Sequence, residues 1–589
     1  DGGVANVGAA TWGNGVTGSV GTISAGNSLI GSSAEDQVGA SINPLNNGHY
    51  VVSAYYWDNG NVVDAGAVTW GNGVTGTSGV VGPGNSLVGS SANDAIGGYV
   101  HALRNGHFVI NSPDWNNGVV VDAGASTWVN GTTGAIGPLG IGNSLIGGGA
   151  NHRVGAVQVT ELTGGDYVVD SPFWDNGGII DAGASTWRSG TANSSGTVSA
   201  SNSLVGSSAN DRVGNYGQCG YGSTALSNGH YVVRSSEWDN GAIANVGAVT
   251  WRNGAGGSGA VVSTGNSLVG TKANDRIGCR DVVALNNGNY VVDSPDWDNV
   301  SNVDAGASTW RSGTGASGAV VSLSNSLIGN IGDNVGYGTT ALSNGHYVVR
   351  SYQWRNGAVM RAGALTWGNG VFGSTGVVSS FNSVVGSQAQ DYVGNGVPFA
   401  QVNGNYVGYH PYWNNGALED AGAITLSFGD GSTVGVITAS NSVRGTAANA
   451  GSTMNYAYDA MRAQLVVGRP ASNLVSLLRP GAVTSVTIVL DTPDPSAFGG
   501  VVTIVTTVVA SPAPTSGSVR IAADTGETCT DVTPMVTSSS TSQFSCQLVF
   551  ASLGQRDVRA EFLGTQTHGY SASGIEPHNV DIIFRNGFE

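Results

Sequence analysis

The sequence of 589 residues is short of charge, and of positive charge above all. Charged residues make up 10% of the chain, Lys272 is the single lysine, and the formal net charge is −17 at pH 7. Such a surface repels phosphate groups, which argues against nucleic acid and anionic membranes as partners. A divalent cation, a neutral glycan or a protein ligand fits this charge better.

Long hydrophobic runs are also missing. No stretch approaches the length of a transmembrane span, and the residues from Asp1 do not resemble a signal peptide, so we expect a soluble chain that has been processed or trimmed. Hydrophobic residues still make up 40% of the sequence, beside 95 glycines. This is enough apolar surface to bury a core, which argues against a disordered chain or a collagen.

Catalytic and zinc-binding patterns are missing too. The sequence contains no Ser/His/Asp order, no Cys/His pair and no spacing typical of zinc ligands. Four histidines share one slot of a repeat, but Asp166, Asn289 and Asn405 fill it in other copies, so the slot accepts any polar residue that suits a turn. The four are His49, His107, His230 and His346. We therefore expect a protein that is not an enzyme and requires no cofactor.

What the sequence has in abundance is repetition. A Thr-Trp pair recurs about every 58 residues, and an Asn-Ser pair followed by small apolar residues and glycine occurs eight times. The tryptophans of the Thr-Trp pairs are Trp12, Trp70, Trp128, Trp187, Trp251, Trp310 and Trp367, with Leu426 in a degenerate eighth copy. All 14 tryptophans lie inside these repeats. A period of this length predicts a repeat architecture.

Each period contains four short runs typical of strands. In the second unit they lie near 95–103, 107–112, 123–128 and 142–154, separated by Gly, Asn, Asp and Pro. Runs such as HYVVRS carry apolar side chains on both alternating faces, so each sheet has neighbours on both sides. Four strands per unit with two buried faces predict a blade of a β-propeller, with residues 1–479 forming about eight blades.

The ends of the array favour a ring over a β-solenoid. The chain enters halfway through a unit at Asp1, and the segment MNYAYDAMRAQLVVGRP supplies a missing first half after the last Asn-Ser pair. A solenoid needs polar caps, whereas a ring pairs its two half-units and removes the edge strands. We therefore predict a propeller closed by N- and C-terminal half-blades. It has eight blades, or seven if the degenerate half lies outside the ring.

The motifs ANDRVG, YVVDSP and DAGAVTW resemble, in order and spacing, the FG-GAP repeats of the integrin alpha-subunit propeller and its bacterial relatives. The resemblance covers roughly residues 1–480 and implies an extracellular, adhesive or ligand-binding propeller. Phe-Gly is Val-Gly or Ile-Gly in this chain, and Gly-Ala-Pro is Asp-Ser-Pro or Arg-Ser-Ser. Family members often bind calcium through an Asp-x-Asp-x-Asp-Gly loop. This chain has LNNGHY or LSNGHY there, so that site does not transfer.

A weaker calcium candidate is the segment WDNGNVVDAG, in which two aspartates lie six residues apart. Two such carboxylates could share a cation across a loop. Aspartates that end strands also accept backbone hydrogen bonds in turns, and Asn245 and Arg361 replace the second aspartate in other copies. The candidate pairs are Asp58 with Asp64, Asp175 with Asp181, and Asp298 with Asp304.

The tryptophans are the candidate ligand-binding residues. Indole rings stack on sugars, but residues present in every unit also pack the units together. Of the two series we expect the one that runs directly into a loop to be the more exposed, namely Trp57, Trp115, Trp174 and Trp297. Function should lie where the copies differ, such as the connections near 214–221 and 398–401, the residues after each Ser-Pro and the tip loops.

After residue 480 the repeat ends, and threonine and valine dominate. The segments TSVTIVLDTPDPSAFGGVVTIVTTVV and GQRDVRAEFLGTQTHGYSAS resemble a bacterial Ig-like repeat found in surface proteins. The resemblance implies an Ig-like β-sandwich of about seven strands over residues 480–589, with the usual role of a spacer or stalk. The tail DIIFRNGFE is a last strand or a pairing segment.

Cysteine is scarce, with four residues. Cys529 and Cys546 are close enough to staple the sandwich, and Cys219 and Cys279 lie one repeat apart in neighbouring first strands. Two disulfides fit an oxidising compartment. Together with the Ig-like resemblance and the single lysine, they predict a bacterial protein that is secreted or attached to the cell surface.

These observations predict a non-catalytic extracellular protein whose propeller binds a glycan or protein ligand on an Ig-like stalk. An alternative is a structural subunit of an extracellular filament or surface layer, in which copies pair through the tail or the sandwich edge. A third hypothesis, a glycan-active propeller enzyme, needs an acidic pair on one face.

Overall fold

The computed structural model describes residues 3–214, 219–220, 222–299, 302–315, 317–439, 441–462, 464–478, 484–563, 565, 568 and 571–581. Regular structure in these residues is β-strand, apart from two three-residue 3-10 turns, η1 (Gly451–Thr453) and η2 (Pro470–Ser472). The predicted all-β class is therefore confirmed. Among the described residues, no helix has the length and hydropathy needed to cross a membrane.

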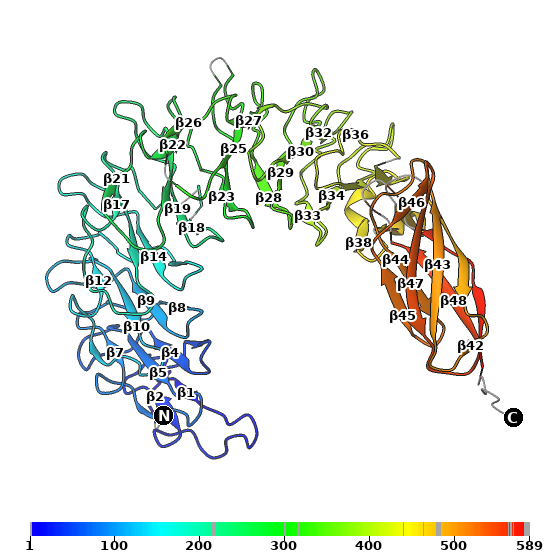
Figure 1. The fold of residues 1–589 in the computed structure, drawn as a ribbon. Coiled ribbons are helices and arrows are strands. Elements are labelled where there is room, and N and C mark those ends of the chain that lie inside the picture. Colours follow the sequence, from blue (N-terminus) through cyan, green and yellow to red (C-terminus); the bar gives the residue numbers. More distant parts are fainter. Residues whose placement is uncertain are drawn as a thin grey trace. The chain divides into compact units, whose positions relative to one another are not determined.

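The chain divides into two compact units. The first comprises Asp1–Ala341, Gly345–Trp354 and Gly368–Val378, and the second Leu342–Asn344, Arg355–Trp367 and Ser379–Glu589. The first unit holds the sheets of the early repeats, which follow one another along the chain (Figure 1). The second holds the last repeat and the C-terminal sheets.

The strands of the repeat fall into five classes, named here by their place in the sheet. The first strands are β3 (Ser41–Pro44), β8 (Tyr99–Ala102), β13 (Thr160–Glu161), β18 (Ser223–Ala225), β23 (Asp281–Ala284), β28 (Gly338–Ala341) and β33 (Phe399–Ala400). The second strands are β4 (Tyr50–Ala54), β9 (Phe108–Ser112), β14 (Tyr167–Ser171), β19 (Tyr231–Ser235), β24 (Tyr290–Ser294), β29 (Tyr347–Ser351) and β34 (Tyr406–His410).

The third and fourth strands carry the Thr-Trp and Asn-Ser phrases. The third strands are β1 (Ala9–Thr11), β5 (Ala67–Gly71), β10 (Ala125–Val129), β15 (Ala184–Arg188), β20 (Ala248–Arg252), β25 (Ala307–Arg311), β30 (Ala364–Gly368) and β35 (Ala423–Ser427). The fourth are β2 (Ser28–Ile30), β7 (Leu87–Val88), β12 (Leu145–Ile146), β17 (Leu204–Val205), β22 (Ser267–Val269), β27 (Ser326–Ile328), β32 (Ser383–Val385) and β37 (Ser442–Arg444). We number the repeats by their third strands, so β1 belongs to repeat 1 and β35 to repeat 8.

The fifth class, the linking strands, connects neighbouring repeats. These two-residue strands are β6 (Gly79–Val80), β11 (Gly137–Pro138), β16 (Gly196–Thr197), β21 (Ala260–Val261), β26 (Ala319–Val320), β31 (Gly376–Val377) and β36 (Gly435–Val436). In the complete sheets of the first unit, the four strands of one repeat pair antiparallel, and the linking strand of the following repeat pairs parallel with the fourth. Four strands per repeat were predicted, but the linking strand was not.

The hydrophobic core lies between repeats. One cluster joins Val51 and Val68 of repeat 2 to Phe108 and Ile110 of repeat 3, and another joins repeats 5 and 6 in the same way. Second strands such as β9 are buried along their whole length. One sheet therefore buries its two faces against its neighbours, as the alternating sequence pattern predicted.

The repeated polar phrases are explained by hydrogen bonds within a repeat. The hydroxyls of Thr69 and Ser86, from the Thr-Trp and Asn-Ser phrases, lie 2.7 Å apart and are buried. Beside them, Asn85 accepts a hydrogen bond from Gly82 N–H and donates one to Val80 O. Corresponding threonine and serine hydroxyls meet in repeats 3 to 7. The phrases hold the third and fourth strands together.

The predicted ring closure is not found in the described residues. In repeat 1, β1 pairs with β2, and β2 takes its other partner, β6, from repeat 2. The C-terminal half-unit forms its own sheet of β38 (Asn455–Asp459), β39 (Gln464–Arg469) and β40 (Leu474–Leu478). The prediction that the two half-blades pair to close a ring is therefore wrong for this structure. Strand β40 pairs with β39 at the position where a closed ring would place a strand of the first repeat. No closed propeller is found among the residues that the structure describes.

The C-terminal half-unit packs on repeat 8 instead. Leu465 and Val467 of β39 share a core with Val407 and Ile424 of repeat 8, and η1 precedes this sheet. The Arg469 guanidinium also donates a hydrogen bond to Arg444 O of β37, at 3.1 Å. Because β37 pairs with no linking strand in the described part of the chain, this contact covers part of its edge.

The residues from 484 onward form two sheets around one core. One sheet has the order β41 (Ser485–Thr492), β43 (Val501–Val509), β47 (Thr541–Val549) and β46 (Met535–Ser538). The other has the order β42 (Ser496–Ala497), β50 (Glu576–Asp581), β48 (Gly554–Phe562), β44 (Val519–Ala523) and β45 (Thr528–Asp531), with β49 (Ser571–Ala572) beside β48. Residues from both sheets share one core, so this part is a β-sandwich. The tail from residue 582 lies outside the described residues, and its pairing role stays a prediction.

Both disulfides are present. Cys529 in β45 bonds to Cys546 in β47 and so joins the two sheets of the sandwich. Cys219 bonds to Cys279 and joins the segments that lead into the first strands of repeats 5 and 6. Two disulfides indicate an oxidising, extracellular environment.

Candidate binding site

The tryptophans predicted to be exposed are buried. Trp57, Trp115, Trp174 and Trp297 have between 3% and 5% of their surface exposed. The loop that follows each one folds back on it, because the Gly66 N–H donates to Trp57 O at 2.9 Å and the Gly124 N–H donates to Trp115 O at 3.0 Å. The prediction of exposure was therefore wrong, and a sugar cannot reach these indole faces without opening the core.

The tryptophans of the Thr-Trp pairs are the more exposed series, and they fasten each repeat to the next. The indole Nε1 of Trp70 donates to Gly131 O at 2.7 Å, and Nε1 of Trp251 donates to Gly313 O at 2.9 Å. The same bond is made by Trp12, Trp128, Trp187, Trp310 and Trp367. This series therefore has a structural role between repeats.

The histidine slot has a structural role as well. His49 Nδ1 accepts a hydrogen bond from the Gly73 N–H at 3.2 Å, and the imidazole packs on Trp70. His107, His230 and His346 accept the corresponding bond. Where the slot holds Asp166, Asn289 or Asn405, a side-chain oxygen accepts it instead. The slot requires an acceptor for one glycine N–H, which explains why its chemistry varies.

The candidate calcium pairs share one loop geometry. In each pair the first carboxylate accepts a hydrogen bond from the backbone N–H of the second residue: Asp58 from Asp64 at 2.9 Å, Asp175 from Asp181 at 2.8 Å, and Asp298 from Asp304 at 2.8 Å. Burial raises the pKa of Asp64, and the charge of Asp58 adds to the rise. Asn116 makes the same bond to Asp122, so the loop closes without two carboxylates. Calcium binding at these pairs stays a prediction.

Within the described residues, one group of three metal-ligating side chains comes together, in the sandwich. It consists of Asp491, Asp494 and His578. His578 is fully buried, with Nδ1 2.9 Å from Asp491 Oδ2 and Nε2 2.9 Å from Ser496 Oγ, and its ring stacks on Phe550. Both ring nitrogens thus have protein partners, and the group links β41, β42 and β50 without an ion.

The repeats differ most in two places that lie against each other. One is the fourth residue of the second strand, here called the second-strand slot, which holds Ser53, Asn111, Asp170, Arg234, Asp293 and Arg350 in the first unit. The other is the first strand of the following repeat. Asn111 Nδ2 donates to Val157 O at 2.9 Å, at the segment leading into β13. The slot residue of one repeat thereby positions the first strand of the next.

The acidic slot residues make the same connection with hydroxyl and amide donors. Asp170 accepts hydrogen bonds from Ser223 N–H at 2.7 Å and Ser223 Oγ at 3.0 Å. Asp293 accepts one from Thr339 Oγ1 at 2.9 Å. Burial raises the pKa of Asp170 to about 6 and that of Asp293 to about 7. Both carboxyls are fully buried and serve the fold between repeats.

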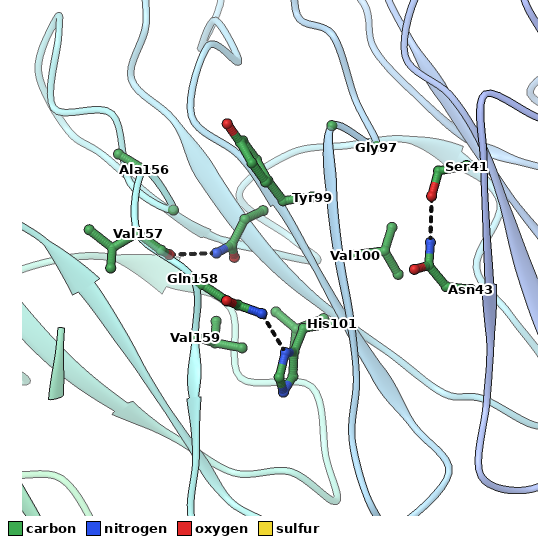
Figure 2. Close-up of a pocket in the computed structure, with 14 residues that line it drawn as sticks. Ser41, Asn43, Gly97, Tyr99, Val100, His101, Ala156, Val157, Gln158 and Val159 are labelled. Carbon is green, nitrogen blue, oxygen red and sulfur yellow. Dashed lines mark hydrogen bonds between the residues drawn. The ribbon is translucent and has the colours of Figure 1, made fainter. Parts of the chain in front are cut away.

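A groove with a volume of about 520 Å³ lies over the first strands of repeats 2 and 3 and the segment 155–159, which leads into β13 of repeat 4. Figure 2 shows Tyr99 and His101 of repeat 3 between Ser41 and Asn43 of repeat 2 and Gln158 of repeat 4. Tyr99 is 62% exposed, and Asn111 of the second-strand slot forms part of the wall. Three repeats therefore contribute different side chains to one concave surface.

His101 is the histidine that lines the groove. The Gln158 Nε2 amide lies 3.4 Å from His101 Nδ1, whereas no described residue hydrogen-bonds to the buried Nε2. Burial lowers the pKa of His101, partly offset by the nearby Glu161 carboxylate, so the imidazole is neutral at pH 7. With Nδ1 accepting from the amide, Nε2 carries the proton, but this nitrogen is buried and does not face the open groove.

Sequence reasoning missed this groove. It placed function in long connections and tip loops, and residues 215–218 and 221 of one such connection lie outside the described residues. The signal was present in the first strands, where Ser41, Tyr99 and Gln158 occupy equivalent positions four residues before Leu45, Leu103 and Leu162. Variation at a fixed place in otherwise similar repeats marks a surface that the fold does not require to be uniform.

Comparison with known families identifies the repeat. A model described as a repeat of unknown function (DUF5650) matches residues 1–40, 44–98, 102–156, 161–215, 225–279, 284–337, 341–395 and 400–453. A search of curated proteins gives no match. These comparisons support neither the FG-GAP resemblance nor an Ig-like identity for the C-terminal sandwich. The eight matches cover most of the chain, and the protein therefore belongs to the DUF5650 repeat family.

Proposed function

We propose that the protein is a non-catalytic extracellular binding protein, and that the groove over β3, β8 and the segment 155–159 holds a neutral glycan. The observation that carries the proposal is the concave surface of about 520 Å³ to which three successive repeats contribute different polar and aromatic side chains. A cavity of this size is in the range that holds a ligand of a few sugar rings.

The chemistry of the lining favours a neutral, hydroxyl-rich ligand. None of the 14 described residues that line the groove is Asp, Glu, Lys or Arg. Tyr99 offers an exposed ring for stacking, and the amides of Asn43 and Gln158 offer hydrogen bonds to hydroxyl groups. Glycoside hydrolysis requires a pair of carboxyl groups. The uncharged lining therefore supports binding over hydrolysis.

The test is a screen of neutral oligosaccharides followed by calorimetric titration of the best ligand. Replacing Tyr99 with alanine should weaken binding about tenfold, the equivalent of about 1.4 kcal/mol of stacking and contact area. Tyr56→Ala is the matched control, because Tyr56 is also an exposed tyrosine but does not line the groove. A failure of every neutral glycan to bind, or an equal loss in the Tyr56 variant, would refute the proposal.

A further inference from the structure

The first strands of the repeats in the first unit and the segments leading into them form a surface that we call the first-strand face. A second feature of this face lies between repeats 6 and 7, where Arg280 is held in a fixed position. Its Nε donates a hydrogen bond to Tyr337 O at 3.0 Å, and its guanidinium carbon lies 4.1 Å from the centre of the Tyr337 ring. Tyr352 packs edge-on against Tyr337, with ring centres 4.5 Å apart. A cation over an aromatic face and one hydrogen bond together restrain a side chain that is exposed to solvent.

The backbone at Arg280 is restrained as well. Arg280 follows Cys279, whose disulfide to Cys219 ties the start of the first strand of repeat 6 to repeat 5. On the other side, β28 begins at Gly338, and a Cβ placed there would lie 3.4 Å from Arg350 Nη1. The Tyr337 N–H donates a hydrogen bond to Arg350 O, so the backbones of Tyr337 and Arg350 are paired beside this contact.

The electrostatics of this place are unusual for a chain with a net charge of −17. Burial lowers the pKa of the Arg350 guanidinium, and the positive charge of Arg280 lowers it further, so two cations lie near each other. No carboxylate of the described residues forms an ion pair with Arg280, and its two Nη groups make no hydrogen bond to the described part of the chain. An oxyanion would relieve the repulsion between the two guanidinium groups.

The neighbouring carboxylates, Asp281 and Asp293, do not neutralise the charge of Arg280. Asp281, the first residue of β23, follows Arg280 in the sequence, but the two side chains form no ion pair. The charge of Asp281 acts on Arg234 of repeat 5 and on Asp293. Asp293 acts on Arg350, but it is fully buried and accepts hydrogen bonds from Ser308 and Thr339. The exposed Arg280 therefore remains available to an outside anion.

We propose that Arg280, with Arg350 and the Tyr337–Tyr352 pair around it, forms a site for the carboxylate of an acidic sugar, a uronic acid residue of a polysaccharide. The planar fork of an arginine matches a carboxylate in a two-point contact. The tyrosines offer ring edges beside it for the rest of the sugar. The choice of a glycan rests on the proposed function of the first-strand face; the anion site itself rests on the contacts of Arg280.

The experiment titrates the full chain with tetragalacturonate and, as the uncharged match, with a neutral galactose tetrasaccharide. Charged hydrogen bonds to one arginine correspond to a loss of about 10- to 100-fold in affinity for the acidic ligand on Arg280→Gln. Arg280→Lys keeps the charge without the fork, so it should recover only part of that affinity. Arg252→Gln removes the same charge elsewhere and should leave the affinity unchanged.

The outcomes separate this inference from the neutral-glycan proposal. Weak tetragalacturonate binding that is equal in wild type, Arg280→Gln and Arg252→Gln would overturn the site, whatever the Tyr99 variant does. Equal affinity for a tetraglutamate peptide would overturn the sugar as the ligand. Loss of neutral binding in Tyr99→Ala, with tetragalacturonate affinity retained, would support two separate sites on one face.

Discussion

Replacing Asp293 with asparagine should remove a pH-dependent part of the stability of the first unit. Asp293 is fully buried in β24, and its Oδ1 accepts hydrogen bonds from Ser308 at 2.7 Å and Thr339 at 2.9 Å. No described residue hydrogen-bonds to its Oδ2. Desolvation raises its pKa to about 7; these hydrogen bonds and Arg350 lower it, whereas Asp281 raises it.

The sign follows from comparing the folded and unfolded chains. The pKa of Asp293 is higher in the folded chain than its ordinary value of 3.8, so the folded state binds the proton more tightly. Protonation of Asp293 therefore increases the free energy of unfolding as the pH falls from above 7 toward 4, and this contribution is lost as the pH rises through 7. At about 1.4 kcal/mol per pKa unit, the whole window amounts to about 4 kcal/mol, of which about 2 kcal/mol lies between pH 7 and pH 5.

The assay is urea unfolding followed by circular dichroism at pH 5, 6, 7 and 8. The difference in unfolding free energy between wild type and Asp293→Asn should shift by about 2 kcal/mol in favour of the wild type on going from pH 7 to pH 5. Asp298→Asn is the control, because it removes a partly exposed carboxylate from the same repeat that is not among the charges acting on Asp293. A pH dependence that is the same in the wild type and Asp293→Asn would refute the reasoning.

Three further substitutions test the packing between repeats. Trp115→Ala should destabilise the chain by about 3 to 5 kcal/mol because the indole is 3% exposed, and a normal denaturation midpoint would contradict its place in the core. Trp251→Phe should cost about 1 kcal/mol, since it chiefly removes the hydrogen bond to Gly313 O; an unchanged midpoint would show that this bond contributes nothing. Cys219→Ser combined with Cys279→Ser opens a loop with a sequence separation of 60 and should cost about 4 kcal/mol, seen as faster proteolysis between repeats 5 and 6; wild-type resistance would contradict this.

Local sequence patterns were sufficient to predict most strands of the repeat. The alternation in the second strands predicted β9 within one residue at its start, whereas the run predicted at 95–103 contains β8 with four extra residues at its start and the run at 123–128 overlaps β10. The polar phrases could be recognised as repeated, although their partners could not be read from the chain. These features depend on interactions between residues close in sequence, which pattern and propensity capture.

Features that depend on the register between repeats could not be predicted. The linking strand β11 has two residues and no hydrophobic pattern of its own, and it becomes a strand only beside β7 of the preceding repeat. Trp115 looked exposed because a loop follows it, but that loop folds back through the Gly124 N–H. The groove at Tyr99 requires the first-strand segments of three repeats to lie side by side, which a single-repeat pattern does not encode.

The coupling between the second-strand slot and the next first strand explains why the repeats cannot be interchanged freely. Asn111 holds the segment at Val157 through an amide, whereas Asp170 holds Ser223 through a carboxylate. A repeat moved to another place would bring its slot residue but meet a first strand with the wrong donors, leaving a buried polar group without a partner at a cost of about 1 to 3 kcal/mol.

The same coupling links stability to the proposed binding face. A buried slot residue helps to position the first-strand segment of the next repeat in three places, as Asp293 of repeat 6 does for Thr339 of repeat 7. A change of ligand specificity at one first strand therefore requires a compatible residue in the slot behind it. This requirement accounts for the variation at the second-strand slot and at the first strand that faces it. The Thr-Trp and Asn-Ser phrases, which hold each sheet together, stay nearly the same from repeat to repeat.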